Sequence, residues 1–447
     1  MNWIRSELMR TLAYVVLLSL IAASPQSAQA RTGENWVVSW TGSVQGPYPV
    51  GNPSAQPDQK FAFPEPATGA RDQTFRLMIR PDVWGRQTRI RLSNSFGTKP
   101  VTFDGAYVGL QWGSAALVRG SNRPVTFGGK TFVIIPPGNS AWSDPVTLPF
   151  VRQPVDLAGR RLAVSFHIVG DSGPMTWHAK ALTTSYVTAP GAGAQGTLED
   201  EAAFPYTTAS WFFLDAIEMS APADTFAIMA FGDSITDGTA STMNGDDRWP
   251  DVLSRRLKAI YGNRVGVVNG GIGGNQVAGP PTYASGMPFA GGRDVLALSG
   301  ISSVIWLEGL NDFSKNGNAS TEQVIAAMKD GVARLRSKWP HIRVVGATLT
   351  SALGSSSAAH GSPEQDAKRK AFNDFIRTSG TFDSVIDFDK AVIDAQSGGL
   401  KPEFIPESTT GGPGDKLHPN RTGYLAMGEA IDLDLFKPGR LDRRANR

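Results

Sequence analysis

The 447-residue sequence contains no cysteine. A chain without thiols cannot form disulfides, use a thiolate as a nucleophile, or bind zinc or iron–sulfur clusters through sulfur. If such a protein is exported, its stability must come from the burial of apolar surface. The chain is long enough for sizeable cores, and its length suggests two domains.

A strong excess of charge is also absent. Lys and Arg total 43 against 40 Asp and Glu, which leaves a formal net charge of only +3. No run of basic residues is interleaved with aromatic ones, so we expect no nucleic-acid partner. The sequence has no H-E-x-x-H and no Walker A motif, and the glycine-rich string "GGIGGNQ" lacks the last glycine of a dinucleotide-binding fingerprint. We therefore expect no metal and no cofactor.

Long apolar runs are scarce, and the one that stands out lies near the N-terminus. Thr11–Ala23 is apolar but short for a membrane span; Arg5 and Arg10 precede it, and the small residues Ala28–Ala30 follow. This order is typical of a secretory signal peptide over residues 1–30, cut after Ala30. An uncleaved N-terminal anchor is the alternative. We expect a secreted or periplasmic protein with no integral membrane segment after cleavage.

Residues 31–222 favour short strands. Apolar residues alternate with others within 74–80, 89–97 and 161–170, and turn sequences rich in Gly, Pro, Asn and Asp separate such segments. This pattern predicts a β-rich accessory domain of the β-sandwich or jelly-roll type.

The pattern changes after residues 220–224. Phe226–Phe231 is a continuous apolar run, as in a strand that is buried on both faces. Further strands are expected within 264–271, 302–312, 342–350 and 382–389, and helices over 249–261, 321–339, 363–379 and 420–436. Strands that alternate with helices predict an α/β domain over residues 223–440, with a parallel sheet covered on both faces.

In open α/β sheets, ligand sites lie beyond the carboxyl ends of the strands. Ser234 follows the first of these strands, within "AIMAFGDSITDGTAS". A serine hydroxyl becomes a good nucleophile only when a base takes its proton and a third group orients that base. Among the five histidines, only His418 stands three residues after an aspartate, Asp415, and two before an expected helix.

The other four histidines fit this role less well. We expect His167 to pack within a strand, His178 to lie in a loop, His341 to precede a strand, and His360 to be solvated in a Gly/Ser-rich surface loop. An acyl-transfer site also needs donors for the oxygen that becomes negative. The candidates are the N–H groups of Ser234 and Gly274, the latter within "NGGIGGN", and the side-chain amide of Asn311 within "EGLND".

These strings, taken in order, resemble the conserved blocks of the SGNH, or GDSL, hydrolase superfamily: "GDSIT", "NGGIGGN", "GLND" and "DKLHP". The resemblance implies a three-layer, flavodoxin-like α/β/α domain. It implies Ser234 as the nucleophile, Asp415 and His418 as its triad partners, and Ser234, Gly274 and Asn311 as the oxyanion hole. More loosely, "VVSWTGSVQ" and "RIRLSNSFGTKPV" resemble a β-rich region that precedes this domain in some secreted members.

Each position also has a plainer interpretation. In this interpretation the roles are structural alone: Ser234 and His418 cap helices, Gly274 and Asn311 form turns, and Asp415 is an acidic residue of a loop. We expect Asp233 and Asp312 to brace the loops by hydrogen bonds, and Trp249 to anchor a helix. For the whole chain we expect a carboxylic-ester hydrolase of the lipase or esterase type, acting on a small-molecule, lipid or glycan ester. A polysaccharide O-acetylesterase and a catalytically inactive glycan-binding protein are the alternatives.

Overall fold

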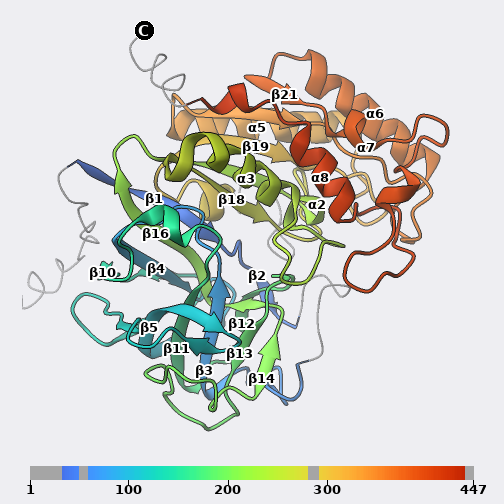
Figure 1. Ribbon diagram of the computed structural model, residues 1–447. Coiled ribbons are helices and arrows are strands. Elements are labelled where there is room, and N and C mark those ends of the chain that lie inside the picture. The colour runs from blue at the N-terminus through green and yellow to red at the C-terminus, as the bar shows by residue number, and fades with distance from the viewer. Residues whose placement is uncertain (1–32, 50–58, 280–290, 438–447) are drawn as a thin grey trace, which may run out of the picture. The chain divides into compact units, whose positions relative to one another are not determined.

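A computed structural model describes residues 33–49, 59–279 and 291–437. The predicted signal peptide, residues 1–30, lies outside the described residues. The described residues form one compact unit with two main hydrophobic cores. Figure 1 shows the strand-rich first part of this unit beside the part that carries the helices. The predicted boundary at residue 222 falls between β16 and β17.

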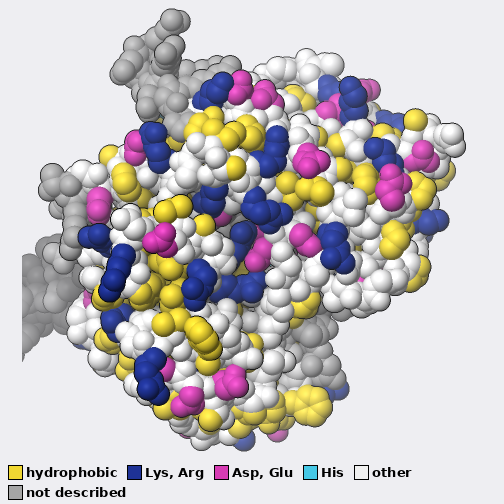
Figure 2. All heavy atoms as spheres, in the orientation of Figure 1, with side chains coloured by type: hydrophobic (Ala, Val, Ile, Leu, Met, Phe, Trp, Pro, Cys, Tyr) yellow, Lys and Arg dark blue, Asp and Glu magenta, His cyan; other side chains and the backbone are white. Residues whose placement is uncertain are grey.

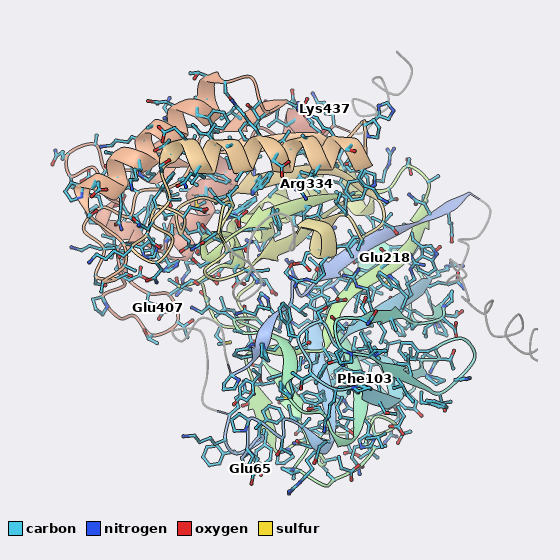
Figure 3. All side chains as sticks on the ribbon, turned by 180° about the vertical axis from the view of Figure 1, so that it is seen from behind. Glu65, Phe103, Glu218, Arg334, Glu407 and Lys437 are labelled. Atoms are coloured by element: carbon cyan, nitrogen blue, oxygen red, sulfur yellow. The ribbon has the colours of Figure 1, made fainter. Side chains whose placement is uncertain are left out.

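The first part contains three antiparallel sheets. One has the order β1 (Glu34–Thr41), β16 (Leu214–Pro222), β4 (Gln87–Ser93), β10 (Val146–Thr147), with β9 (Ser140–Trp142) on β4. The second has β14 (Tyr206–Thr208), β13 (Ser185–Val187), β3 (Arg71–Ile79), β11 (Leu162–Asp171), β5 (Val101–Gly113) and β6 (Ala116–Leu117), with β7 (Arg123–Pro124) and β8 (Phe132–Ile135) on β5. The third has β15 (Trp211–Phe212), β12 (Met175–His178) and β2 (Gln45–Tyr48). The prediction of a β-rich region is confirmed, and Figure 3 labels Phe103, which lies in its core.

The second part is built on five parallel strands in the order β18 (Val265–Gly271), β17 (Phe226–Gly232), β19 (Ile301–Leu307), β20 (Arg343–Ala347), β21 (Ser384–Ile386). In chain order this is 2-1-3-4-5, the order of flavodoxin-like sheets. The order reverses between β17 and β19, so their carboxyl ends flank the crevice where such sheets bind ligands.

Helices lie on both faces of the parallel sheet. They are α2 (Ser234–Asp237), α3 (Trp249–Tyr261), α5 (Thr321–Lys338), α6 (Pro363–Thr378), α7 (Phe388–Val392) and α8 (Arg421–Glu429). Figure 1 shows α3 and α8 in front of the sheet, and Figure 3 shows α5, which carries the labelled Arg334, over the opposite face. Among the described residues, no helix has the length and apolar character that crossing a membrane requires.

The expected elements over 249–261, 321–339 and 363–379 are confirmed as helices, and Trp249 is buried at the start of α3, as predicted. The predicted last helix over 420–436 is wrong in its second half. Helix α8 ends at Glu429, and a separate 3-10 turn follows at Leu433–Phe436. The side chain of Asp432 accepts a hydrogen bond from the N–H of Asp434 and so begins the new turn.

Buried polar contacts join the β-rich region to the parallel-sheet region. The Asp82 carboxylate accepts hydrogen bonds from the Ser254 hydroxyl at 2.6 Å and from the N–H of Val267 at 2.5 Å. Strand β1 contributes Val37 and Val38 to the core of the parallel-sheet region. On the face drawn in Figure 2, basic and acidic side chains are interspersed among the described residues.

His178, from the β-rich region, contacts the short helix α2 that the candidate nucleophile Ser234 begins. It ends β12 and is buried, which corrects the prediction that it lies in a loop. Its Nε2 lies 3.1 Å from Asp237 Oδ1, at the end of α2, and its Nδ1 lies 3.1 Å from the carbonyl oxygen of Ser43. Both partners are acceptors, so both ring nitrogens donate. Burial by itself lowers the pKa of His178, but Asp237 and the Ser43 carbonyl raise it above its ordinary value.

We predict that His178→Ala lowers the free energy of unfolding by about 3–5 kcal/mol near pH 6, because the buried carboxylate of Asp237 loses its partner. The folded-state pKa of His178 is raised, so this stabilisation is present below the unfolded-state pKa and is lost as pH rises through the folded-state value. Urea unfolding at about pH 6 and pH 10 measures both effects. The control is His341→Ala, at an exposed histidine. An equal loss of unfolding free energy at both pH values in His178→Ala would contradict a charged His178 paired with Asp237.

Candidate active site

The candidate nucleophile stands where β17 turns into α2. Strand β17 ends at Gly232, and the Asp233 carboxylate caps α2 by accepting a hydrogen bond from the N–H of Ile235 at 2.9 Å. Ser234 is the first residue of α2, so its N–H belongs to the helix-terminal amides that have no intrahelical acceptor. The local structure therefore holds Ser234, a residue that is 7% exposed, at the carboxyl end of the sheet.

The structure brings Ser234, His418 and Asp415 together. Ser234 Oγ lies 2.8 Å from His418 Nε2, across 184 positions of sequence, and His418 Nδ1 lies 2.6 Å from Asp415 Oδ2. The carboxylate can only accept at this end of the ring, so Nδ1 carries the proton and the lone pair of Nε2 faces the serine hydroxyl. This is the arrangement in which an imidazole can remove a proton from serine.

Asp415 is fixed as an anion. Its Oδ1 also accepts hydrogen bonds from the N–H groups of Leu417 and His418, both at 2.9 Å. Partial burial by itself raises the pKa of Asp415, but the His418 ring and the two backbone donors hold it well below its usual range. The carboxylate therefore stays charged at any working pH and stabilises a proton on the imidazole.

The glycine-rich loop after β18 packs against α2 on one side and is open on the other. A Cβ at Gly271 would lie 2.2 Å from the backbone nitrogen of Asp237, so only glycine allows this close approach. The N–H of Asn275 donates to the carbonyl of Ile272 at 3.0 Å and closes a turn in which Gly274 has φ +82°. A Cβ at Gly274 would meet no atom within 4 Å, and the residue is partly exposed, so the loop is open at this position.

Asn311 connects this loop with the end of β19. Its Nδ2 donates to the carbonyl oxygen of Asn275 at 3.0 Å, which leaves a second N–H on the same nitrogen. Its Oδ1 lies 3.2 Å from His360 Nε2. The prediction that His360 is a solvated surface residue is therefore wrong: the ring is only partly exposed and contacts a candidate oxyanion-hole residue. The loop that carries His360 folds inward because the Ser355 hydroxyl and the Ser356 N–H donate to the backbone carbonyl oxygen of Asp415.

Residues 230–426 match the model of the GDSL-like Lipase/Acylhydrolase family. This segment is a GDSL-like lipase/acylhydrolase domain. The family match identifies an ester-hydrolysing enzyme and spans every candidate site residue. No curated protein is similar to the chain at a significant level.

Several solved structures are similar to about half of this chain. The lipase/acylhydrolase from Enterococcus faecalis is 20% identical, with a TM-score of 0.36, over 48% of this chain and 98% of its own. The carbohydrate acetylesterase Est24 from Sinorhizobium meliloti is 13% identical, with a TM-score of 0.36, over 50% and 99%. The aryl esterase of M. Smegmatis is 14% identical, with a TM-score of 0.35, over 50% and 99%.

Three buried carboxyl groups brace the GDSL-like domain under the candidate site. Asp312 accepts hydrogen bonds from the N–H groups of Val277 and Ala278 at 2.9 and 2.7 Å, and Glu308 accepts one from the Trp306 indole at 2.7 Å. Burial raises the pKa of Asp233 to about 7 and that of Asp312 to about 6, and it raises the pKa of Glu308 well above its ordinary value. The predicted bracing roles of Asp233 and Asp312 are confirmed.

Sequence reasoning missed two contributors to the GDSL-like site. The carbonyl of Asn275 leaves no signal in a sequence, because any residue supplies a carbonyl. The sequence shows His360 as a histidine among Gly and Ser residues in a loop, but this pattern does not indicate which residues the loop packs against. Within the described ranges, no group of three or more acidic or histidine side chains is arranged to hold a metal ion.

Proposed function

We propose that this chain is an exported serine hydrolase that cleaves carboxylic esters through an acyl-enzyme. Ser234 is the nucleophile, His418 the general base and acid, and Asp415 the group that orients the imidazole. The observation that carries the proposal is the continuous pair of hydrogen bonds from Asp415 through His418 to Ser234, at 2.6 and 2.8 Å.

In the first half-reaction, Ser234 Oγ bonds to the ester carbonyl carbon while its proton passes to His418 Nε2. The carbonyl oxygen becomes an oxyanion, which the N–H groups of Ser234, Gly274 and Asn311 stabilise. The imidazolium is stabilised in turn by the Asp415 anion. When the tetrahedral intermediate collapses, the carbon–oxygen bond to the alcohol breaks and His418 gives its proton to the leaving oxygen.

In the second half-reaction, water takes the place of the alcohol. His418 removes a proton from the water as the oxygen attacks the acyl carbon of the serine ester, and the same donors hold the oxyanion. Collapse breaks the bond to Ser234 Oγ and returns the proton to the serine. The acid product leaves, and the three side chains are back in their starting protonation states.

We predict that Ser234→Ala lowers the turnover of p-nitrophenyl acetate by at least ~10⁴-fold. Asp415→Asn should lower it by about 10³–10⁴-fold, because an amide can donate to Nδ1 and so favours the wrong tautomer. Circular dichroism checks that both variants are folded. An organophosphonate should label the wild-type chain and not Ser234→Ala. Undiminished turnover in Ser234→Ala would contradict the proposal, and an unreactive wild-type chain would favour a binding protein.

The proposed substrate class is a broad range of carboxylic esters, as in lipases and esterases. The alternative is an O-acetylesterase that acts on acetylated polysaccharide. We predict turnover of p-nitrophenyl esters over several acyl chain lengths, and release of acetate from acetylated xylan at less than about one tenth of the p-nitrophenyl acetate rate, a tenfold difference being ~1.4 kcal/mol of barrier. Strict preference for acetyl groups with rapid xylan deacetylation would favour the alternative.

The proposal of export rests on the N-terminal sequence pattern alone. If it is correct, the N-terminal residue of the protein recovered outside the cytoplasm is Arg31. An intact N-terminus on that material would instead favour the membrane anchor.

A further inference from the structure

The orientation of the Asn311 side chain is determined by two contacts. The carbonyl oxygen of Asn275 can only accept a hydrogen bond, so the nitrogen of the Asn311 amide must face it. Asn311 Nδ2 lies 3.0 Å from this oxygen. The amide oxygen then faces His360 Nε2 at 3.2 Å, and since that oxygen can only accept, Nε2 must carry a proton. One N–H of Asn311 remains for a ligand.

His360 is held in place from several sides. Its Nδ1 lies 3.2 Å from the hydroxyl of Ser357, and its backbone N–H donates to the carbonyl of Ser357 at 3.1 Å. The same loop binds the carbonyl oxygen of Asp415 through the hydroxyl of Ser355 at 2.8 Å and the N–H of Ser356 at 3.0 Å. The loop thus links the backbone of Asp415 to the side-chain amide of Asn311.

The ring acts as a neutral donor. With a proton on Nε2, Nδ1 is free to accept from the Ser357 hydroxyl, so a neutral imidazole satisfies both contacts. Burial, and after it the nearby His418, lowers the pKa of His360 to about 4. A neutral ring beside the triad does not oppose the positive charge that His418 gains during the reaction.

We propose that His360 is a positioning residue of the oxyanion hole, acting through its hydrogen bond to Asn311 Oδ1. The bond prevents the amide from rotating or flipping, and it polarises the amide so that its free N–H is a stronger donor. The inference rests on the proposed ester hydrolysis. Because the oxyanion exists only near the transition state, His360 should affect kcat rather than KM.

The test is a double-mutant cycle with p-nitrophenyl acetate. We expect His360→Ala to lower kcat by about 10–50-fold with KM within about twofold, less than the ~10²–10³-fold typical of losing a whole donor. In an Asn311→Ala background, the same substitution should cost less than about twofold, because the residue through which it acts is gone. His360→Gln, which retains an N–H donor, should recover part of kcat. His341→Ala, at an exposed histidine, should match the wild type.

Additive losses in the cycle, or a change in KM alone, would overturn the inference. His360→Met fills the same space without a donor; a folded Met variant with wild-type kcat would also overturn it, including where the alanine variant does not fold. The two proposals fail separately. Wild-type turnover in Ser234→Ala would end the proposed hydrolysis, whereas an inactive Ser234→Ala with an additive cycle would end only the role of His360.

Discussion

The hydrogen bond between Ser234 Oγ and His418 Nε2 is the contact on which the candidate site depends. Neither residue alone carries chemistry, because a serine hydroxyl without a base keeps its proton at neutral pH. The bond forms because Ser234 follows β17, which lies between β18 and β19 in the parallel sheet, and His418 precedes α8, which packs on the same side of the sheet as α3. The fold thus converts a separation of 184 residues into a distance of 2.8 Å.

The β-rich region contributes to this site indirectly, by contacts to the elements that carry or flank Ser234. His178 binds Asp237, the last residue of the short helix that Ser234 begins, and Asp82 binds the first part of β18 and the middle of α3. A four-residue helix has little stability of its own, so contacts at its end help to fix the position of its first residue. The two regions are in this sense parts of one catalytic scaffold.

Much of this architecture could be predicted from the sequence, because the signals were local. Phe226–Phe231 reads as a strand buried on both faces, and the spacing of Asp415 and His418 allows a carboxylate to reach an imidazole within one turn. The inward fold of the loop that carries His360 could not be predicted, because it depends on the backbone carbonyl of Asp415, which is 60 positions from Ser355, the serine whose hydroxyl binds it. The end of α8 at Glu429 could not be predicted either. The apolar residues Leu433 and Phe436 continue the helical spacing, although the Asp432 side chain begins a separate turn there.

We propose that Ser234, Gly274 and Asn311 surround one reacting carbonyl group beside His418. A crystal structure of the protein after reaction with an organophosphonate p-nitrophenyl ester tests this most directly. We predict a covalent bond from Ser234 Oγ to phosphorus, with the phosphoryl oxygen about 3 Å from the Gly274 nitrogen and from Asn311 Nδ2. An adduct on another residue, or a phosphoryl oxygen that points to solvent away from both nitrogens, would contradict it.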